Sequence, residues 1–174
     1  MSDVQVFKPG SSHQIPLVCC VQACTEPVLE LGCGWYSTPL LHALCQGRRL
    51  ISVDSDRDWM DQFSCLTSKS HSLICSTPEG DCVLPPAFWG VVLVDNRPHT
   101  RRVVDIQKFR RTARWLVCHD TEDPVYGYGP VLDTFTYRCD FTLFSPWTSV
   151  VSDNSPIPES LLSCSSGAPH GVVK

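Results

Sequence analysis

The stretch Val28-Leu29-Glu30-Leu31-Gly32-Cys33-Gly34-Trp35-Tyr36-Ser37-Thr38-Pro39 decides the fold of this chain. An apolar run ends at two glycines spaced one residue apart, and a helix is expected to begin at Ser37 or Thr38. Because glycine has no side chain and tolerates unusual dihedral angles, such a turn can bring bare backbone close to a ligand. A second apolar run over 50–53 ends at Asp54, twenty residues after Gly34. The two runs predict a nucleoside site at the carboxyl ends of neighbouring parallel strands.

The spacing of the glycines indicates which kind of nucleoside fits. A dinucleotide-binding turn has the pattern G-x-G-x-x-G, but Ser37 stands here at the position of the third glycine. Glu30 precedes Gly32 by two residues, and a carboxylate there would repel a pyrophosphate, whereas it suits a cation or an amino group. A nucleotide-dependent oxidoreductase is therefore disfavoured, and a tight turn without any ligand is the plainer alternative.

The pattern E-x-G-x-G, followed by an acidic residue that closes the second strand, resembles the class I methyltransferases, which bind S-adenosylmethionine. The resemblance covers about 27–151. It implies that the backbone around Gly32 passes beside the methionine and ribose of the cofactor, that Asp54 accepts hydrogen bonds from the ribose hydroxyls, and that Glu30 holds the amino-acid end directly or through water. The cofactor-binding set implied in this way comprises Glu30, Gly32, Gly34, Tyr36, Ser37, Asp54 and Asp95.

Apolar runs that alternate with helical spacing predict an α/β fold. Strands are expected at 27–31, 50–53, 72–75, 90–94 and 115–118, helices at 37–46, 57–66 and 101–112, and a closing hairpin at 137–144 and 147–151. This alternation predicts a Rossmann-like, doubly wound, mostly parallel sheet with helices on both faces. The methyltransferase resemblance implies the strand order 3-2-1-4-5, extended by the antiparallel hairpin. We expect an N-terminal arm or cap (1–25) with a short helix over 16–23, a cofactor-binding domain (26–151) and a Ser/Pro-rich tail (152–174), mobile or strapped over the surface.

Composition narrows the partners and the compartment. The chain has 174 residues, of which 43% are hydrophobic and 18% charged, as in one globular domain. A net charge of −4 argues against a broad nucleic-acid-binding surface. We expect the basic cluster over 101–114 to form a solvated face of a helix. The sequence shows neither an apolar run of about 18 residues nor a signal peptide, so we predict a cytoplasmic protein without a membrane partner. The eleven cysteines are expected to be reduced, with a metal site at Cys19, Cys20 and Cys24 as a minor alternative.

Polar residues follow two strands that should end at the same edge of the sheet. Asp95 follows the fourth strand, and His119 and Asp120 follow the fifth, so these three are the candidate catalytic residues. Histidine titrates near neutral pH, which makes His119, or His99, a candidate general base. The chain also looks like the metal-dependent small-molecule O-methyltransferases at these positions. That resemblance implies that Asp95 and Asp120 bind Mg²⁺ or a similar divalent cation.

The sequence favours methyl transfer from S-adenosylmethionine to a small-molecule acceptor, at oxygen rather than elsewhere. One alternative is a non-catalytic S-adenosylmethionine-binding module that regulates or scaffolds a partner. Another is an RNA or nucleotide methyltransferase, although Lys108 follows Asp95 too soon for the lysine–aspartate–lysine–glutamate set of RNA ribose methyltransferases. The acceptor and a homo-oligomeric state stay open.

Overall fold

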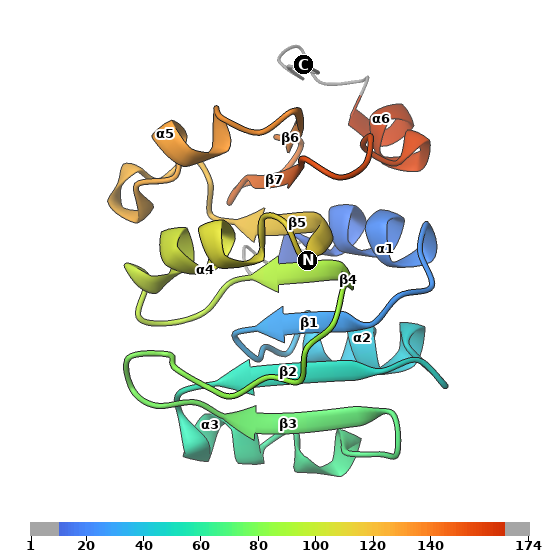
Figure 1. Ribbon diagram of the computed structural model, residues 1–174, viewed down its shortest axis with the longest axis vertical. Coiled ribbons are helices and arrows are strands. Elements are labelled where there is room, and N and C mark those ends of the chain that lie inside the picture. The colour runs from blue at the N-terminus through green and yellow to red at the C-terminus, as the bar shows by residue number, and fades with distance from the viewer. Residues whose placement is uncertain (1–10, 166–174) are drawn as a thin grey trace, which may run out of the picture.

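The chain folds around a seven-stranded sheet with the order β3-β2-β1-β4-β5-β7-β6 (Figure 1). This computed structural model describes residues 11–165. The predicted fold class and the strand order 3-2-1-4-5 with an antiparallel hairpin are confirmed, since β7 pairs antiparallel with both β5 and β6. The strands are β1 (Val28–Leu31), β2 (Leu50–Asp54), β3 (His71–Cys75), β4 (Trp89–Val94), β5 (Ala113–His119), β6 (Tyr137–Phe141) and β7 (Thr148–Ser152).

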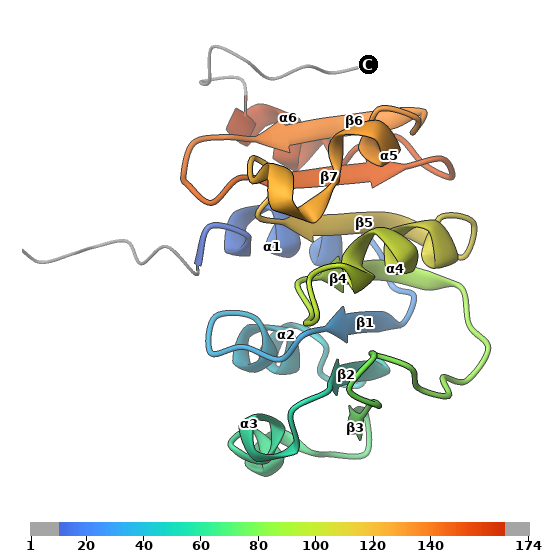
Figure 2. The ribbon, with the colours of Figure 1, turned by 90° about the vertical axis from the view of Figure 1, so that its left-hand side faces the viewer.

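The central strands are apolar on both sides because helices cover both faces of the sheet. On one face lie α1 (Gln14–Gln22), α2 (Thr38–Leu44) and α6 (Glu159–Ser165), and on the other lie α4 (Arg101–Phe109) and α5 (Gly129–Leu132). Figure 2 shows α4 and α5 in front of the strands, with α1 and α6 behind them. Strand β4 serves both layers: Val91 and Leu93 join the first core, and Val92 and Val94 join the second.

The parallel register brings the carboxyl ends of the inner strands to one level. Leu31 at the end of β1 stands opposite Val53 of β2 and Val94 of β4. The residues that follow, including Gly32, Asp54 and Asp95, are therefore neighbours across the top of the sheet.

Two helical predictions differ from the structure. The helix predicted at 57–66 is split into α3 (Arg57–Asp61), whose first turn is capped by the Asp56 carboxylate, and a 3₁₀ turn, η2 (Ser64–Leu66). The segment after β5, predicted as a loop, contains the 3₁₀ turn η3 (Pro124–Tyr126) and α5. Pro124 and Pro130 each stand at the start of these turns, where a missing backbone N–H costs nothing.

Both end segments contribute to the core within the described residues. Leu17 of α1 and Leu161 of α6 are fully buried in the same cluster as Val91 of β4. Part of the predicted tail is thus a helix packed beside α1, whereas the predictions for 1–10 and 166–174 lie outside the described residues. All eleven cysteines are free thiols, and Cys19, Cys20 and Cys24 do not form a metal-ligating group in the described chain. No helix between residues 11 and 165 is long and apolar enough to cross a membrane.

Candidate functional site

A cleft of about 870 Å³ opens beyond the carboxyl ends of β1, β2, β4 and β5. That volume lies within the roughly 300–1,000 Å³ range of small-molecule and cofactor sites. The wall of the cleft is mostly polar and contains the backbone of the glycine turn and several carboxylates. The lining residues are Gly32, Cys33, Asp54, Ser55, Asp56, Trp59, Asp95, Arg97, Pro98, His99, Arg102, His119, Asp120 and Tyr126.

Gly32 lets the first loop touch the end of β4. Its φ is +94°, and a Cβ built on it would lie 2.5 Å from the backbone oxygen of Asp95. Any larger residue would be strained by the dihedral angle and would clash with backbone that has no room to move. The glycine therefore sets the floor of the cleft, where bare backbone faces any ligand.

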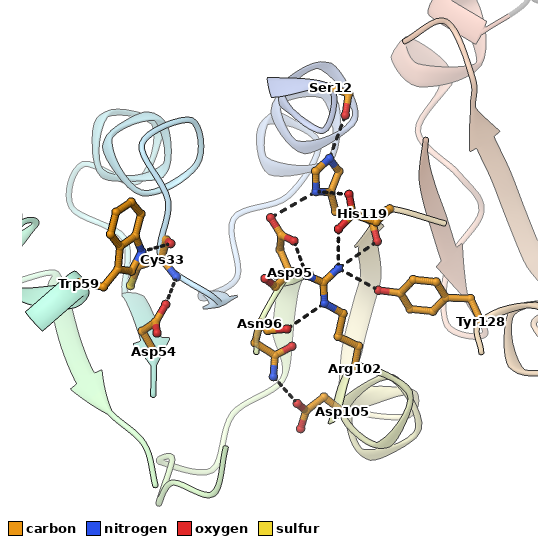
Figure 3. Close-up of polar contacts among 11 residues, drawn as sticks. Ser12, Cys33, Asp54, Trp59, Asp95, Asn96, Arg102, Asp105, His119 and Tyr128 are labelled. Atoms are coloured by element: carbon orange, nitrogen blue, oxygen red, sulfur yellow. Dashed lines mark hydrogen bonds and ion pairs between the residues drawn. The ribbon is translucent and has the colours of Figure 1, made fainter. Parts of the chain in front are cut away.

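Asp54 is held rigidly at the end of β2. Its Oδ2 accepts a hydrogen bond from the Cys33 N–H at 2.8 Å, and its Oδ1 accepts one from the Asp56 N–H at 3.0 Å. The indole of Trp59 donates to the Cys33 carbonyl at 2.8 Å, which ties α3 to the same loop (Figure 3). Each carboxylate oxygen keeps a second lone pair, so the side chain can still accept a hydroxyl donor from the cleft.

Glu30 stands behind the glycine turn rather than in the cleft wall. It is fully buried, and its Oε1 accepts a hydrogen bond from Thr38 Oγ1 at 3.0 Å, while Thr38 Oγ1 accepts one from the Gly34 N–H at 2.9 Å. Burial raises the pKa of Glu30 to about 7, and the hydroxyls of Ser37, Ser52 and Thr38 offset part of that rise. The carboxyl group thus organises the turn from below.

Three further members of the predicted cofactor set, Gly34, Tyr36 and Ser37, are also absent from the cleft lining. Their contact with a cofactor, like that of Glu30, stays a prediction. Ser37 is buried at the start of α2, and its side chain makes no capping hydrogen bond to the helix.

Arg102 is the centre of the polar network, and its burial corrects the prediction that the 101–114 cluster is a solvated face. The side chain donates from Nη2 to Asp95 Oδ1 at 2.8 Å, from Nη1 to Asp120 Oδ2 at 2.9 Å and from Nε to the Asn96 carbonyl at 2.8 Å (Figure 3). The residue is only 4% exposed. The two carboxylates, with Tyr128, outweigh the burial and raise the pKa of Arg102 above its ordinary value.

His119 lies between the two carboxylates on the other side. Its Nδ1 is 3.3 Å from both Asp95 Oδ2 and Asp120 Oδ1, and its Nε2 is 2.9 Å from Ser12 Oγ (Figure 3). Burial alone would lower the pKa of His119, but Asp95 and Asp120 outweigh it and raise the pKa. Burial alone would raise the pKa of Asp95, yet His119 and Arg102 bring it below the usual value. The imidazole is therefore stabilised in its charged form.

The three predicted catalytic residues Asp95, His119 and Asp120 do meet at the cleft. Both carboxylates, however, are already paired with Arg102 and His119. Arg102 bridges both carboxylates, so the pair implied as Mg²⁺ ligands already neutralises a guanidinium. Asp120 also has a φ of +61°, the single positive φ outside glycine in the described residues, and such strain is commonly kept at functional sites. His99, the other candidate base, is on the exposed rim and packs edge-on to Tyr126.

Sequence reasoning missed three residues of this network: Ser12, His13 and Arg102. The sequence does contain a sign that Arg102 is buried. It lies three, four and seven residues before Asp105, Ile106 and Phe109, which is the spacing of one helix face, and these are the buried residues of α4. Ser12 and His13 precede α1 and reach the end of β5, more than 100 residues away in the chain. No local pattern indicates such a contact.

Comparison with known proteins points to one fold. No protein-family model and no curated protein matches the chain in sequence. Among solved structures, a human methyltransferase 10 domain containing protein matches with a TM-score of 0.56 and 13% identity, over 86% of this chain and 85% of that one. An rRNA methylase from Streptococcus thermophilus matches with a TM-score of 0.56 and 14% identity, over 86% and 99% of the two chains.

The N-terminal domain of human METTL16, in complex with SAH, matches with a TM-score of 0.57 and 11% identity, over 82% of this chain and 68% of that one. Against the bifunctional kinase-methyltransferase WbdD, this chain spans 38% of the longer protein. At such low identity these likenesses define the fold, in agreement with the strand order and the glycine turn. The chain has the fold of the class I S-adenosylmethionine-dependent methyltransferases.

Proposed function

We propose that the cleft binds S-adenosylmethionine and that the chain transfers its methyl group to a small molecule, at oxygen. The observation that carries this proposal is the convergence of Gly32, Asp54 and Asp95 on one cleft of about 870 Å³. The bare backbone at Gly32 suits the methionine and ribose portion, and Asp54 has lone pairs left for the ribose hydroxyls. The SAH bound in the METTL16 structure supports the same ligand for this fold.

The chemistry asks mainly for alignment. The acceptor oxygen attacks the methyl carbon, the carbon–sulfur bond breaks, and its electron pair stays on sulfur, which gives S-adenosylhomocysteine. Holding the nucleophile, methyl carbon and sulfur in line contributes up to roughly 7–11 kcal/mol. The new bond leaves positive charge on the acceptor oxygen and acidifies its proton, which then passes to solvent or to a nearby carboxylate. Asp95, with its pKa lowered, acts in this scheme as an ionised acceptor that orients the hydroxyl.

Two alternatives have one supporting observation each. The similarity to an rRNA methylase favours an RNA acceptor, but a net charge of −4 gives little attraction for a polyanion. The pairing of Asp95 and Asp120 with Arg102 and His119 favours a non-catalytic cofactor-binding module, because it leaves neither carboxylate as a free strong base.

Transfer of a radiolabelled methyl group separates these functions. Wild-type protein and the Asp54→Ala variant are incubated with methyl-labelled S-adenosylmethionine and with separate small-molecule, RNA and protein fractions of a lysate. We expect label in the small-molecule fraction, lost with Asp54→Ala but kept with Asp61→Ala, an exposed residue of α3. Label in RNA alone would replace the proposal with the RNA alternative, and cofactor binding without any transfer would favour the module.

A further inference from the structure

The imidazole of His13 is the feature that the proposed function leaves unexplained. His13 is 2% exposed, and neither of its ring nitrogens has a hydrogen-bond partner. It stands at the first position before α1 and makes no capping hydrogen bond to that helix. Buried polar groups are nearly always satisfied in folded proteins, so a fully unpartnered imidazole calls for a partner of another kind.

His13 faces the residues at the ends of β4 and β5. Its ring meets the ring of His119 edge-on, with centroids 4.7 Å apart. One ligand atom each from His13, Asp95 and His119 lies within 4.8 Å of the other two, and this is the one such group of three among residues 11–165. Asp95 and His119 also line the cleft, so the group has an open side toward any bound molecule.

From this geometry we infer that His13, Asp95 and His119 form a binding site for a divalent transition-metal ion. Two imidazole nitrogens and one carboxylate oxygen are typical ligands of Zn²⁺, Fe²⁺ and Co²⁺, whereas Mg²⁺ and Ca²⁺ prefer all-oxygen sites. This set differs from the Asp95–Asp120 pair predicted for Mg²⁺, because it uses His13 and leaves Asp120 with Arg102. The site does not depend on the proposed methyl transfer.

The distances are compatible with coordination. Ligand atoms bound tetrahedrally at about 2.0–2.1 Å from an ion lie about 3.3–3.4 Å apart. His119 Nδ1 and Asp95 Oδ2 already have that separation, 3.3 Å. All three ligand atoms lie within 4.8 Å of one another, so the longest separation exceeds the tetrahedral spacing by at most about 1.5 Å.

The outer partners are those that a metal-bound histidine and carboxylate require. Arg102 holds Asp95 through Oδ1, which leaves Oδ2 directed at His119. Ser12 Oγ is 2.9 Å from His119 Nε2. When Nδ1 binds the ion, the proton is on Nε2, and this N–H donates a hydrogen bond to Ser12 Oγ. A bound ion would replace the proton of His119 Nδ1, which would pass to solvent. Because Asp95 and His119 line the cleft, water or an acceptor oxygen could reach the ion from that side.

Titration with Co²⁺ tests the site, because its visible absorption reports both binding and ligand type. Wild-type protein should bind one Co²⁺ with nitrogen and oxygen ligands. His13→Phe, which keeps a ring but removes both nitrogens, should weaken Co²⁺ binding by more than the roughly 10–100-fold typical of lost outer partners, and Ser12→Ala should weaken it within that range. His99→Ala, which removes an exposed imidazole on the same cleft, should leave it unchanged.

Controls separate this site from the eleven cysteines and from misfolding. Circular dichroism establishes that each variant is folded before titration. Thiolate coordination produces an intense near-ultraviolet charge-transfer band, which the inferred site lacks. The inference is overturned if wild-type protein binds no Co²⁺, if the bound ion shows the thiolate band, or if folded His13→Phe binds Co²⁺ as tightly as wild type. Each of these readouts is independent of S-adenosylmethionine, so a failed methyl-transfer assay does not decide the outcome.

Discussion

Replacing Glu30 by glutamine should make the protein more stable at neutral and alkaline pH. The carboxyl group is fully buried behind the glycine turn, and burial raises its pKa from 4.5 to about 7. Glutamine has the same shape, stays neutral, and can still accept the hydrogen bond from Thr38 Oγ1 through its amide oxygen. It therefore removes the cost of a buried charge without removing the contact that orders the turn.

The magnitude follows from the two pKa values. Between pH 4.5 and about 7 the folded protein keeps the Glu30 proton while the unfolded chain has lost it, so stability falls as pH rises through this interval and is level above it. A rise from 4.5 to about 7 corresponds to roughly 3 kcal/mol, at about 1.36 kcal/mol for each pH unit. About 2.5 kcal/mol of that cost appears between pH 5 and pH 8.

Urea unfolding at pH 5 and at pH 8 measures the effect, with Glu26→Gln as a matched control. The Arg114 side chain lowers the pKa of Glu26, so this carboxylate is ionised in both states across the interval and its replacement should give a nearly constant difference. For Glu30→Gln, the gain in free energy of unfolding over wild type should be larger at pH 8 by about 2.5 kcal/mol. A gain that is equal at the two pH values would refute the view that burial raises the pKa of Glu30.

Three further predictions concern the floor of the cleft, the guanidinium and a second buried histidine. Gly32→Ala should destabilise the protein by about 1–3 kcal/mol from backbone strain alone, whereas Gly129→Ala, whose Cβ meets nothing within 4 Å, should change thermal stability little. Arg102→Met should cost about 3–5 kcal/mol in urea unfolding because it strands two carboxylates, and an equal loss from Arg111→Met, at an exposed arginine after α4, would argue against this network. Burial first, and His42 second, lower the pKa of His71 to about 4, so stability present above pH 6.5 is lost as pH falls toward 4. In His71→Gln, the free energy of unfolding should therefore fall less steeply between pH 6.5 and pH 4 than in wild type. An unchanged slope would mean that groups other than His71 cause the loss of stability in acid.

The fold could be predicted from the sequence because its signals are local. The apolar run before Gly32 and the run before Asp54 each specify a buried strand, and the parallel order follows once helices alternate with them. The split helix after Asp56 and the short helix after Gly127 were missed because the turns are only three to five residues long. Such short pieces depend on proline, capping and packing more than on periodicity.

The site could be predicted only in part. Asp54, Asp95, His119 and Asp120 follow strands whose ends must meet, so topology alone brings them to the cleft. The charge states of Asp95 and His119 depend on Arg102, which comes from a helix face, and Ser12 and His13 reach His119 from a segment before α1. Contacts at that sequence separation are set by how the helices pack on the sheet, and no spacing in a single sequence encodes them.

Calorimetric titration with S-adenosylhomocysteine tests the central claim most directly, namely that the cleft between Gly32 and Asp54 holds the adenosyl cofactor. Wild-type protein should bind one equivalent, Asp61→Ala should bind equally well, and Asp54→Ala should lose about 1–3 kcal/mol of binding free energy because the ribose hydroxyls lose their acceptor. Absence of binding to the wild type, or an unchanged affinity of Asp54→Ala, would contradict the account.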